Sequence, residues 1–101
     1  MALIEVGVIP LGTETPSVSR YVAGAVKVLR GEKDIKYELT AMGTIIEGSL
    51  ERLMSLARKM HEAAFEAGAV RVVTTIKIDE RRDEAASMSS KLEAVRRQLG
   101  N

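Results

Sequence analysis

The sequence predicts an α+β fold, in which four β-strands alternate with two α-helices and a further helix follows. Several short segments are rich in β-branched residues or alternate apolar with polar side chains, as half-buried strands do. Two longer segments repeat apolar residues at helical spacing, and each ends at a glycine. The 101 residues, of which 46% are hydrophobic, fit one domain over residues 1–101 with one apolar core.

Four segments have the composition of strands: Ala2–Pro10, Ile35–Thr40, Gly43–Ser49 and Ala69–Asp79. In the second of them, Ile35, Tyr37 and Leu39 alternate with polar residues, which predicts that these three side chains form a buried face. The connection between the second and third strands is short enough for a hairpin, in which Gly43 would supply any positive φ that the turn requires.

The first helix is predicted between the first two strands. Thr15 is a suitable N-cap with Pro16 at the first helical position, and Ser17 is a competing cap. The helix is expected to end at Arg30 and Gly31, where the glycine can adopt the left-handed conformation.

Two more helices are predicted in the second half of the chain. Ser49 can cap the first of them, which ends at Gly68. The charged segment Glu80–Glu84 reads as a turn, and a helical pattern starts at about Ala85. Its apolar stripe is narrow and consists of Met88, Leu92, Val95 and Leu99. Such a stripe docks on its own domain or meets the same helix of another subunit.

The order of these elements is that of a ferredoxin-like βαββαβ sandwich with an extra C-terminal helix. In this fold both helices cover one face of a four-stranded antiparallel sheet, the other face stays open, and the first and third strands are central. Strand alternation then places on the open face Glu5, Lys36, Glu38, Thr40, Glu47, Thr75 and Lys77.

Among these residues, Glu47 requires an explanation, because its charged side chain lies in a short apolar strand, GTIIEGS. One interpretation is a polar residue on a wet or oligomer-facing surface. The other is a carboxylate that orients a ligand.

Several function classes are disfavoured by the residues. The chain has no cysteine, a formal net charge of +1, three aromatic residues and one histidine, His61, which argues against thiolate metal sites, nucleic acid binding and zinc catalysis. We read His61 as a structural residue. The loop LGTETP lacks the arginine of an acylphosphatase anion loop. No signal peptide or span of about 20 apolar residues is evident, so we expect a cytoplasmic protein that does not bind membranes.

Three blocks carry a family resemblance: IPLGTETPSVSRYVA, YELTAMGTIIEG and VRVVTTIKIDERRD. They resemble the thiamine-binding-protein family of small ferredoxin-like proteins. The resemblance implies a cytoplasmic, non-enzymatic protein without a cofactor, which assembles as dimers or tetramers through its sheets and binds thiamine or its hydroxymethylpyrimidine part. The tyrosine, threonine and glutamate of the family's hairpin block are present here as Tyr37, Thr44 and Glu47.

We therefore expect a binding protein for thiamine or a related pyrimidine. Glu47 would orient the ring, and Thr40, Thr44, Thr75 or Lys77 would complete the site through hydrogen bonds. Alternation places Glu47 on the open face while Tyr37 and Thr44 point to the helical one, so a bulge or pocket must reconcile them. The alternative is a structural or regulatory homo-oligomer whose open sheet face is a subunit interface. An enzyme that uses Glu47 as acid or base beside Lys77 is disfavoured because no partner group is evident.

Overall fold

The structure, a computed structural model, describes residues 1–83 and 87–100. Its elements are β1 (Ala2–Leu11), α1 (Ser19–Lys27), β2 (Lys36–Leu39), β3 (Thr44–Gly48), α2 (Leu50–Glu66), β4 (Arg71–Glu80) and α3 (Met88–Gln98). This order confirms the predicted βαββαβ arrangement with an added C-terminal helix.

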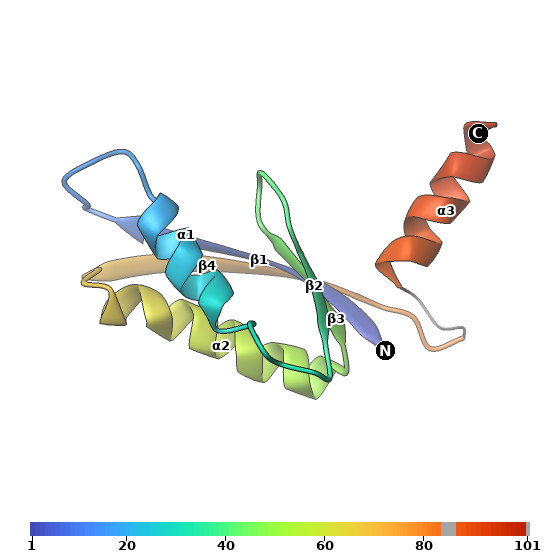
Figure 1. The fold of residues 1–101 in the computed structure, drawn as a ribbon, viewed down its shortest axis with the longest axis horizontal. Helices are drawn as coiled ribbons and strands as arrows, with labels where there is room; N and C mark the ends of the chain where they lie inside the picture. The colour runs from blue at the N-terminus through green and yellow to red at the C-terminus, as the bar shows by residue number, and fades with distance from the viewer. Residues whose placement is uncertain (84–86, 101) are drawn as a thin grey trace.

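The four strands form one antiparallel sheet in the order β2-β3-β1-β4, so β1 and β3 are central, as predicted. The register pairs Leu3 with Glu47 and with Asp79, and it pairs Lys36 with Glu47. Helices α1 and α2 lie beside each other against the sheet, whereas α3 stands apart from them, at the end of the sheet that holds the N-terminus (Figure 1).

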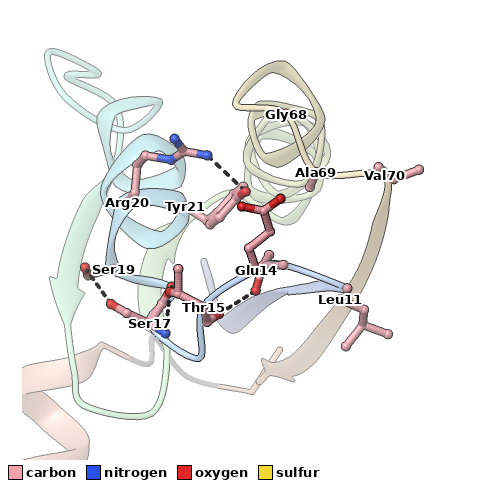
Figure 2. A pocket seen from close by; sticks show the side chains of 12 residues that line it. Leu11, Glu14, Thr15, Ser17, Ser19, Arg20, Tyr21, Gly68, Ala69 and Val70 are labelled. Carbon is pink, nitrogen blue, oxygen red and sulfur yellow. Dashed lines mark hydrogen bonds between the residues drawn. The ribbon is translucent and has the colours of Figure 1, made fainter.

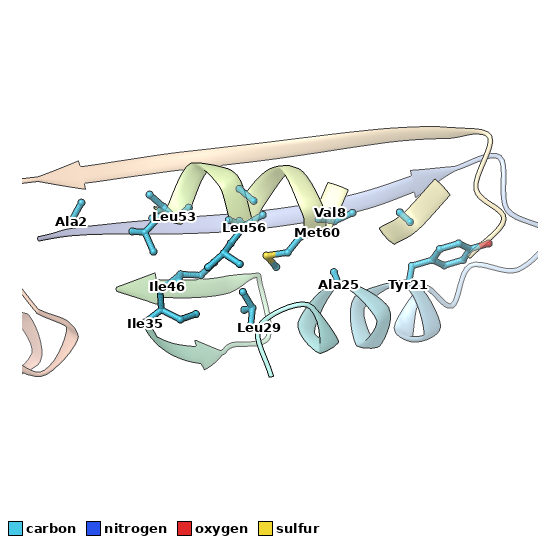
Figure 3. Packing of buried hydrophobic residues seen from close by; sticks show 14 residues of the cluster. Ala2, Val8, Tyr21, Ala25, Leu29, Ile35, Ile46, Leu53, Leu56 and Met60 are labelled. Carbon is cyan, nitrogen blue, oxygen red and sulfur yellow. The ribbon is translucent and has the colours of Figure 1, made fainter. Parts of the chain in front are cut away.

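The core fills the space between the sheet and the two helices (Figure 3). Its fully buried large side chains come from β1, β3, α2 and the turn that follows α1, and include Ile4, Ile46, Leu56, Met60 and Leu29. Burying a side chain of this size stabilises the fold by about 1.5–3 kcal/mol. One face of β1 and β3 is therefore fixed by packing, and the opposite face is left for other contacts.

Helix α1 begins at Ser19, four residues after the predicted cap, so the prediction of Thr15 or Ser17 as N-cap was wrong. The Thr15 hydroxyl instead accepts a hydrogen bond from the Ser17 amide at 3.0 Å and holds a local turn. Such side-chain bonds compete with helix formation. The helix ends at Lys27 and not at Arg30 and Gly31 as predicted, although Gly31, in the turn that follows, has the predicted left-handed conformation with φ of +80°.

Helix α2 matches its prediction closely: Ser49 is the N-cap, and Gly68 follows its end with φ of +107°. The extended φ and ψ of Ser49 suit an N-cap, although its hydroxyl makes no capping hydrogen bond. The sharp start of α2 fixes the end of β3, and with it the position of Glu47.

The hairpin between β2 and β3 does not use a positive φ at Gly43, because the glycines with positive φ in the described residues lie elsewhere. The Thr40 hydroxyl closes the turn instead: it accepts from the amides of Met42 and Gly43 and donates to the Gly43 carbonyl at 2.8 Å. Gly43 is required for close approach, since a Cβ there would lie 3.1 Å from the Val6 carbonyl oxygen.

The prediction that Ile35, Tyr37 and Leu39 form one buried face was correct only for Ile35. Tyr37 is 40% exposed and Leu39 is 56% exposed. Both belong to β2, which is an edge strand. Period-two alternation reports the face to which a side chain points, but not whether a helix reaches far enough to cover it.

Helix α3 begins at Met88, after an N-cap at Ser87 whose hydroxyl accepts from the Ser90 amide. The predicted starting point, Ala85, and the last residue of the predicted charged turn, Glu84, lie outside the described residues. No residue of α3 is buried. An ion pair between Lys91 and Asp79 joins this helix to β4. Its apolar stripe thus finds no cover within the described part of the chain.

Candidate functional site

The open face of the sheet carries two rows of mainly polar side chains. The register places Lys36, Glu47, Leu3 and Asp79 in one row, and Glu38, Ile45, Glu5 and Lys77 in the next. Neighbouring residues in a row belong to adjacent strands and can contact each other. Strand pairing therefore brings Glu47 and Lys77 to the same face, in adjacent rows and two strands apart.

Glu47 is unexpectedly buried for a residue on this face, with 6% of its surface exposed. Within residues 1–83 and 87–100 it forms neither a hydrogen bond nor an ion pair, although Lys36 lies directly across from it. No fully enclosed side-chain oxygen or nitrogen in that part of the chain lacks a partner. The Glu47 carboxylate therefore keeps a narrow path to solvent or to a group that docks there.

A second feature, which we call the hairpin cavity, lies between α1 and the β2–β3 hairpin and has a volume of about 320 Å³. Its lining contains no charged side chain: the residues are Val6, Gly7, Val8, Ile9, Val18, Val22, Ala25, Leu39, Thr40, Ala41, Met42, Gly43, Thr44, Met60 and Thr75. Ligand pockets range from about 300 to 1,000 Å³ and are mostly apolar, with a few convergent polar groups. The hairpin cavity fits the lower end of this range.

Two glycines let this cavity collect residues from both faces of the sheet. Thr44 points to the helical face and Thr75 to the open one, yet both line the cavity. Gly7 and Gly43 lie among the lining residues and allow their neighbours to approach closely. A Cβ on Gly7 would lie 3.0 Å from the Thr75 hydroxyl. Of the six predicted site residues, the cavity brings together Thr40, Thr44 and Thr75.

Thr44 is the polar side chain best placed to meet a ligand in the hairpin cavity. It is 3% exposed, and its hydroxyl has no hydrogen-bond partner among the described residues. Because no fully enclosed polar atom of that region is left unpaired, this hydroxyl is not fully enclosed, and Thr44 is one of the residues that line the cavity. A hydrogen bond from a ligand to this hydroxyl would contribute about 1 kcal/mol.

The remaining predicted site residues lie elsewhere. Tyr37 and Glu47 are not among the residues that line the hairpin cavity. Lys77 lines a different space of about 750 Å³, between the open face and the start of α3. Thr40 lines both spaces, but its hydroxyl is already bonded within the hairpin turn. Its role in the described structure is to shape the cavity wall.

Two methionines complete the cavity and were not predicted as site residues. Met60, from α2, is fully buried, and Met42, at the hairpin tip, is exposed. Thioether sulfur makes favourable contacts with aromatic rings, worth about 0.3–1.5 kcal/mol. The methionines can therefore hold a flat heterocycle in a chain with few aromatic residues. A methionine at helical spacing carries no signal that separates this role from ordinary core packing.

His61 has a structural explanation. Its Nδ1 lies 2.6 Å from the Thr74 hydroxyl, and its ring makes an edge contact with Phe65. Within residues 1–83 and 87–100, no three histidine, cysteine or carboxylate side chains gather where they could hold a metal ion. None of the helices in that part is long and apolar enough to cross a membrane.

The chain is similar over nearly its whole length to a known protein family. The family model described as thiamine-binding protein matches residues 4–96. The UPF0045 protein YqgV of Bacillus subtilis is 50% identical, and the alignment covers 98% of both chains. A UPF0045 protein of Methanothermobacter thermautotrophicus is 43% identical over 98% of this chain and 100% of its own length. The crystal structure of the hypothetical protein MJ1052 of Methanocaldococcus jannaschii has 38% identity and a TM-score of 0.85, and it covers 93% of this chain and 94% of its own.

Proposed function

Since the chain belongs to the thiamine-binding protein family, we propose that it is a non-enzymatic binding protein for thiamine or its hydroxymethylpyrimidine moiety. The observation that carries this proposal is the buried, unpaired hydroxyl of Thr44 in the hairpin cavity. Thr44 is also one of the three residues that the family resemblance indicates.

The chemistry of the cavity favours the pyrimidine part of such a ligand. The aminopyrimidine is flat and uncharged, and its ring nitrogens and exocyclic amine can pair with one hydroxyl. The cavity supplies that hydroxyl among apolar walls and offers no carboxylate to a cation. Burying a thiazolium there without a counter-charge would be costly. In this binding mode the thiazolium of thiamine stays at the mouth, near Met42.

Isothermal titration calorimetry with hydroxymethylpyrimidine and with thiamine tests the proposal. Saturable heat is expected from the wild-type protein. Thr44→Val keeps the shape and removes the hydroxyl, so it should weaken binding about fivefold to tenfold, which corresponds to one net hydrogen bond of about 1 kcal/mol.

Glu38→Gln is the matched control, because Glu38 is exposed and lies outside the cavity lining. Its affinity should equal that of the wild type. An absence of heat with both ligands contradicts the binding function. Equal affinities of wild type and Thr44→Val contradict the assignment of the cavity.

The alternative function, a homo-oligomer joined through the open sheet face, is favoured by a separate observation. That face exposes Ile9 and Val73, and α3 exposes Leu92, Val95 and Leu99 along one stripe. These two groups lie toward opposite ends of β1, and exposed apolar side chains of this kind gain free energy when a partner removes them from water. A second copy of the chain would cover both regions and would supply the missing partner of Glu47.

Light scattering tests the homo-oligomer, which can exist together with ligand binding. Leu92→Asp with Val95→Asp should lower the measured mass of an oligomer to that of the single chain, and Glu47→Ala should change it as well. Val70→Asp, at an exposed position outside both surfaces, should leave the mass unchanged. A wild-type mass equal to one chain argues against the oligomer.

A further inference from the structure

A second cavity lies at the opposite end of β1 from α3, where the loop after β1 meets the turn after α2. It has a volume of about 570 Å³, and Figure 2 shows the side chains that line it. Glu14 comes from the loop, Arg20 and Tyr21 come from the first turn of α1, and Gly68–Val70 close the far wall. We call it the loop cavity.

Arg20 is held in a fixed position in this cavity. Its guanidinium donates to the Ala67 carbonyl and to the Tyr21 hydroxyl, both at 3.0 Å, and it lies 4.9 Å from the centroid of the Tyr21 ring. Tyr21 is buried and belongs to the core cluster. The Arg20 side chain has therefore already lost its conformational entropy in the ligand-free protein, and ligand binding does not include this cost.

Arg20 also lacks an anionic partner. Among residues 1–83 and 87–100, the other arginines that donate side-chain hydrogen bonds each pair with a carboxylate: Arg52, Arg58, Arg81 and Arg82. Arg20 instead contacts only a carbonyl and a phenol. A guanidinium has five N–H donors, and its planar fork matches a carboxylate. Donors of Arg20 thus remain for an anion in the loop cavity.

The loop that faces Arg20 has a defined shape. The Thr13 hydroxyl donates to the Thr15 carbonyl at 2.7 Å, and Thr15 binds the Ser17 amide. Gly12, with φ of +72°, turns the chain out of β1. This shape brings the Glu14 side chain into the same space as Tyr21 (Figure 2). Glu14 makes no ion pair or hydrogen bond within the described residues.

From these observations we propose that the loop cavity is a binding site for a small zwitterion of the α-amino acid class. Arg20 binds its carboxylate and Glu14 binds its ammonium group. A simple anion would meet the like charge of Glu14, and a simple cation would meet that of Arg20. A ligand that carries both charges satisfies both residues. The hydroxyls of Ser17 and Ser19, which hydrogen-bond to each other at 3.4 Å, also line this cavity.

Titration followed by ¹H–¹⁵N NMR tests this proposal, because it detects weak binding and reports its position. The probes are a pool of neutral L-amino acids, then each of them alone, with acetate and methylammonium as single-charge controls at equal ionic strength. We expect saturable shifts at residues 12–21 and 67–70 with at least one amino acid, and affinities at least tenfold weaker for acetate and methylammonium.

Two variants separate ligand binding from a structural role. Glu14→Gln removes a charge that has no partner in the described structure, and it should weaken amino acid binding at least tenfold without changing the unfolding curve. Arg20→Gln should weaken binding to a similar extent, but it also removes the contact with Ala67. Glu51→Gln, at an exposed position on α2, is the matched control and should bind as the wild type does.

Three outcomes would overturn the proposal: no saturable shift with the amino acid pool, acetate binding as tightly as any amino acid, or unchanged affinity in Glu14→Gln. Hydroxymethylpyrimidine titrated into the same variants reports on the hairpin cavity alone. Failure at one cavity can therefore be told apart from failure at the other.

Discussion

Strand β3 buries one polar side chain on each of its two faces, and the surroundings of these two side chains differ in kind. Thr44 faces the helices and opens into the hairpin cavity, whose lining is uncharged. Glu47 faces the other way, between Leu3 and Lys36. Neither has a hydrogen-bond partner in the described residues.

The difference indicates what each face can bind. An unpaired hydroxyl among apolar walls costs little and suits a neutral heterocycle, whereas a carboxylate that is not fully enclosed needs a cation or several donors. In the function proposed above, one strand would thus hold a small molecule on its covered face and a charged partner on its open face. Substitutions on each face test whether the two faces act independently.

The largest expected effect is the difference in the free energy of unfolding between alanine variants of two neighbouring isoleucines on β3. Ile46 is fully buried against the helices, whereas Ile45 is half-buried on the open face. Ile46→Ala should lower the free energy of unfolding by about 3 kcal/mol, because it leaves a cavity in the core. Ile45→Ala should lower it by about 1 kcal/mol.

Urea unfolding at several protein concentrations measures both values. If the cost of Ile45→Ala grows with protein concentration, the open face is a subunit interface, because association then contributes to stability. Equal costs for the two variants at every concentration would contradict the division into a covered and an open face.

A smaller difference in stability is expected between valine variants of two threonines that line the hairpin cavity. Thr40→Val removes the hydroxyl that binds the amides of Met42 and Gly43, and it should destabilise the protein by about 1 kcal/mol. The control is Thr75→Val, which removes a hydroxyl with no partner in the described residues and should leave thermal unfolding unchanged. A larger loss of stability in Thr75→Val than in Thr40→Val would show that the turn does not depend on the Thr40 hydroxyl.

The smallest expected effect is on the stability of the ligand-free protein. Thr44→Val should leave the free energy of unfolding unchanged or raise it by up to about 1 kcal/mol, because an unpaired buried hydroxyl is removed. Chemical denaturation without ligand measures it. A clear loss of stability would mean that the Thr44 hydroxyl has a structural partner, and the cavity would lose its polar anchor.

The sequence predicts the fold well because its signals are local and redundant. Gly68 follows the end of α2 where expected, and the strand order follows from topology once the elements are known. The start of α1 could not be predicted, because Thr15 can cap a helix or close a turn with Ser17, and its residue type does not separate these roles.

The candidate site is less predictable, because it depends on where strands separate. The sequence indicates Thr44 and Glu47 through the family resemblance and places them on opposite faces by alternation. The pairing of β1 with β3 ends at Val6 and Thr44, and the hairpin cavity lies beside this point. Arg20 was not predicted as a site residue, because it lies in the first turn of α1 and not in the loop LGTETP, where an acylphosphatase anion loop would carry its arginine.

The proposal that the ligand binds in the hairpin cavity, and not at Glu47 on the open face, is tested by the position of bound hydroxymethylpyrimidine. ¹H–¹⁵N NMR titration locates this position residue by residue. We predict saturable shifts of the amides of Val22, Met42, Gly43 and Thr44 around the hairpin cavity. The amides of Lys36, Glu47 and Asp79, in the row on the open face, should remain unchanged. Shifts confined to that row, with none around the cavity, would contradict binding in the hairpin cavity and would place the ligand beside Glu47.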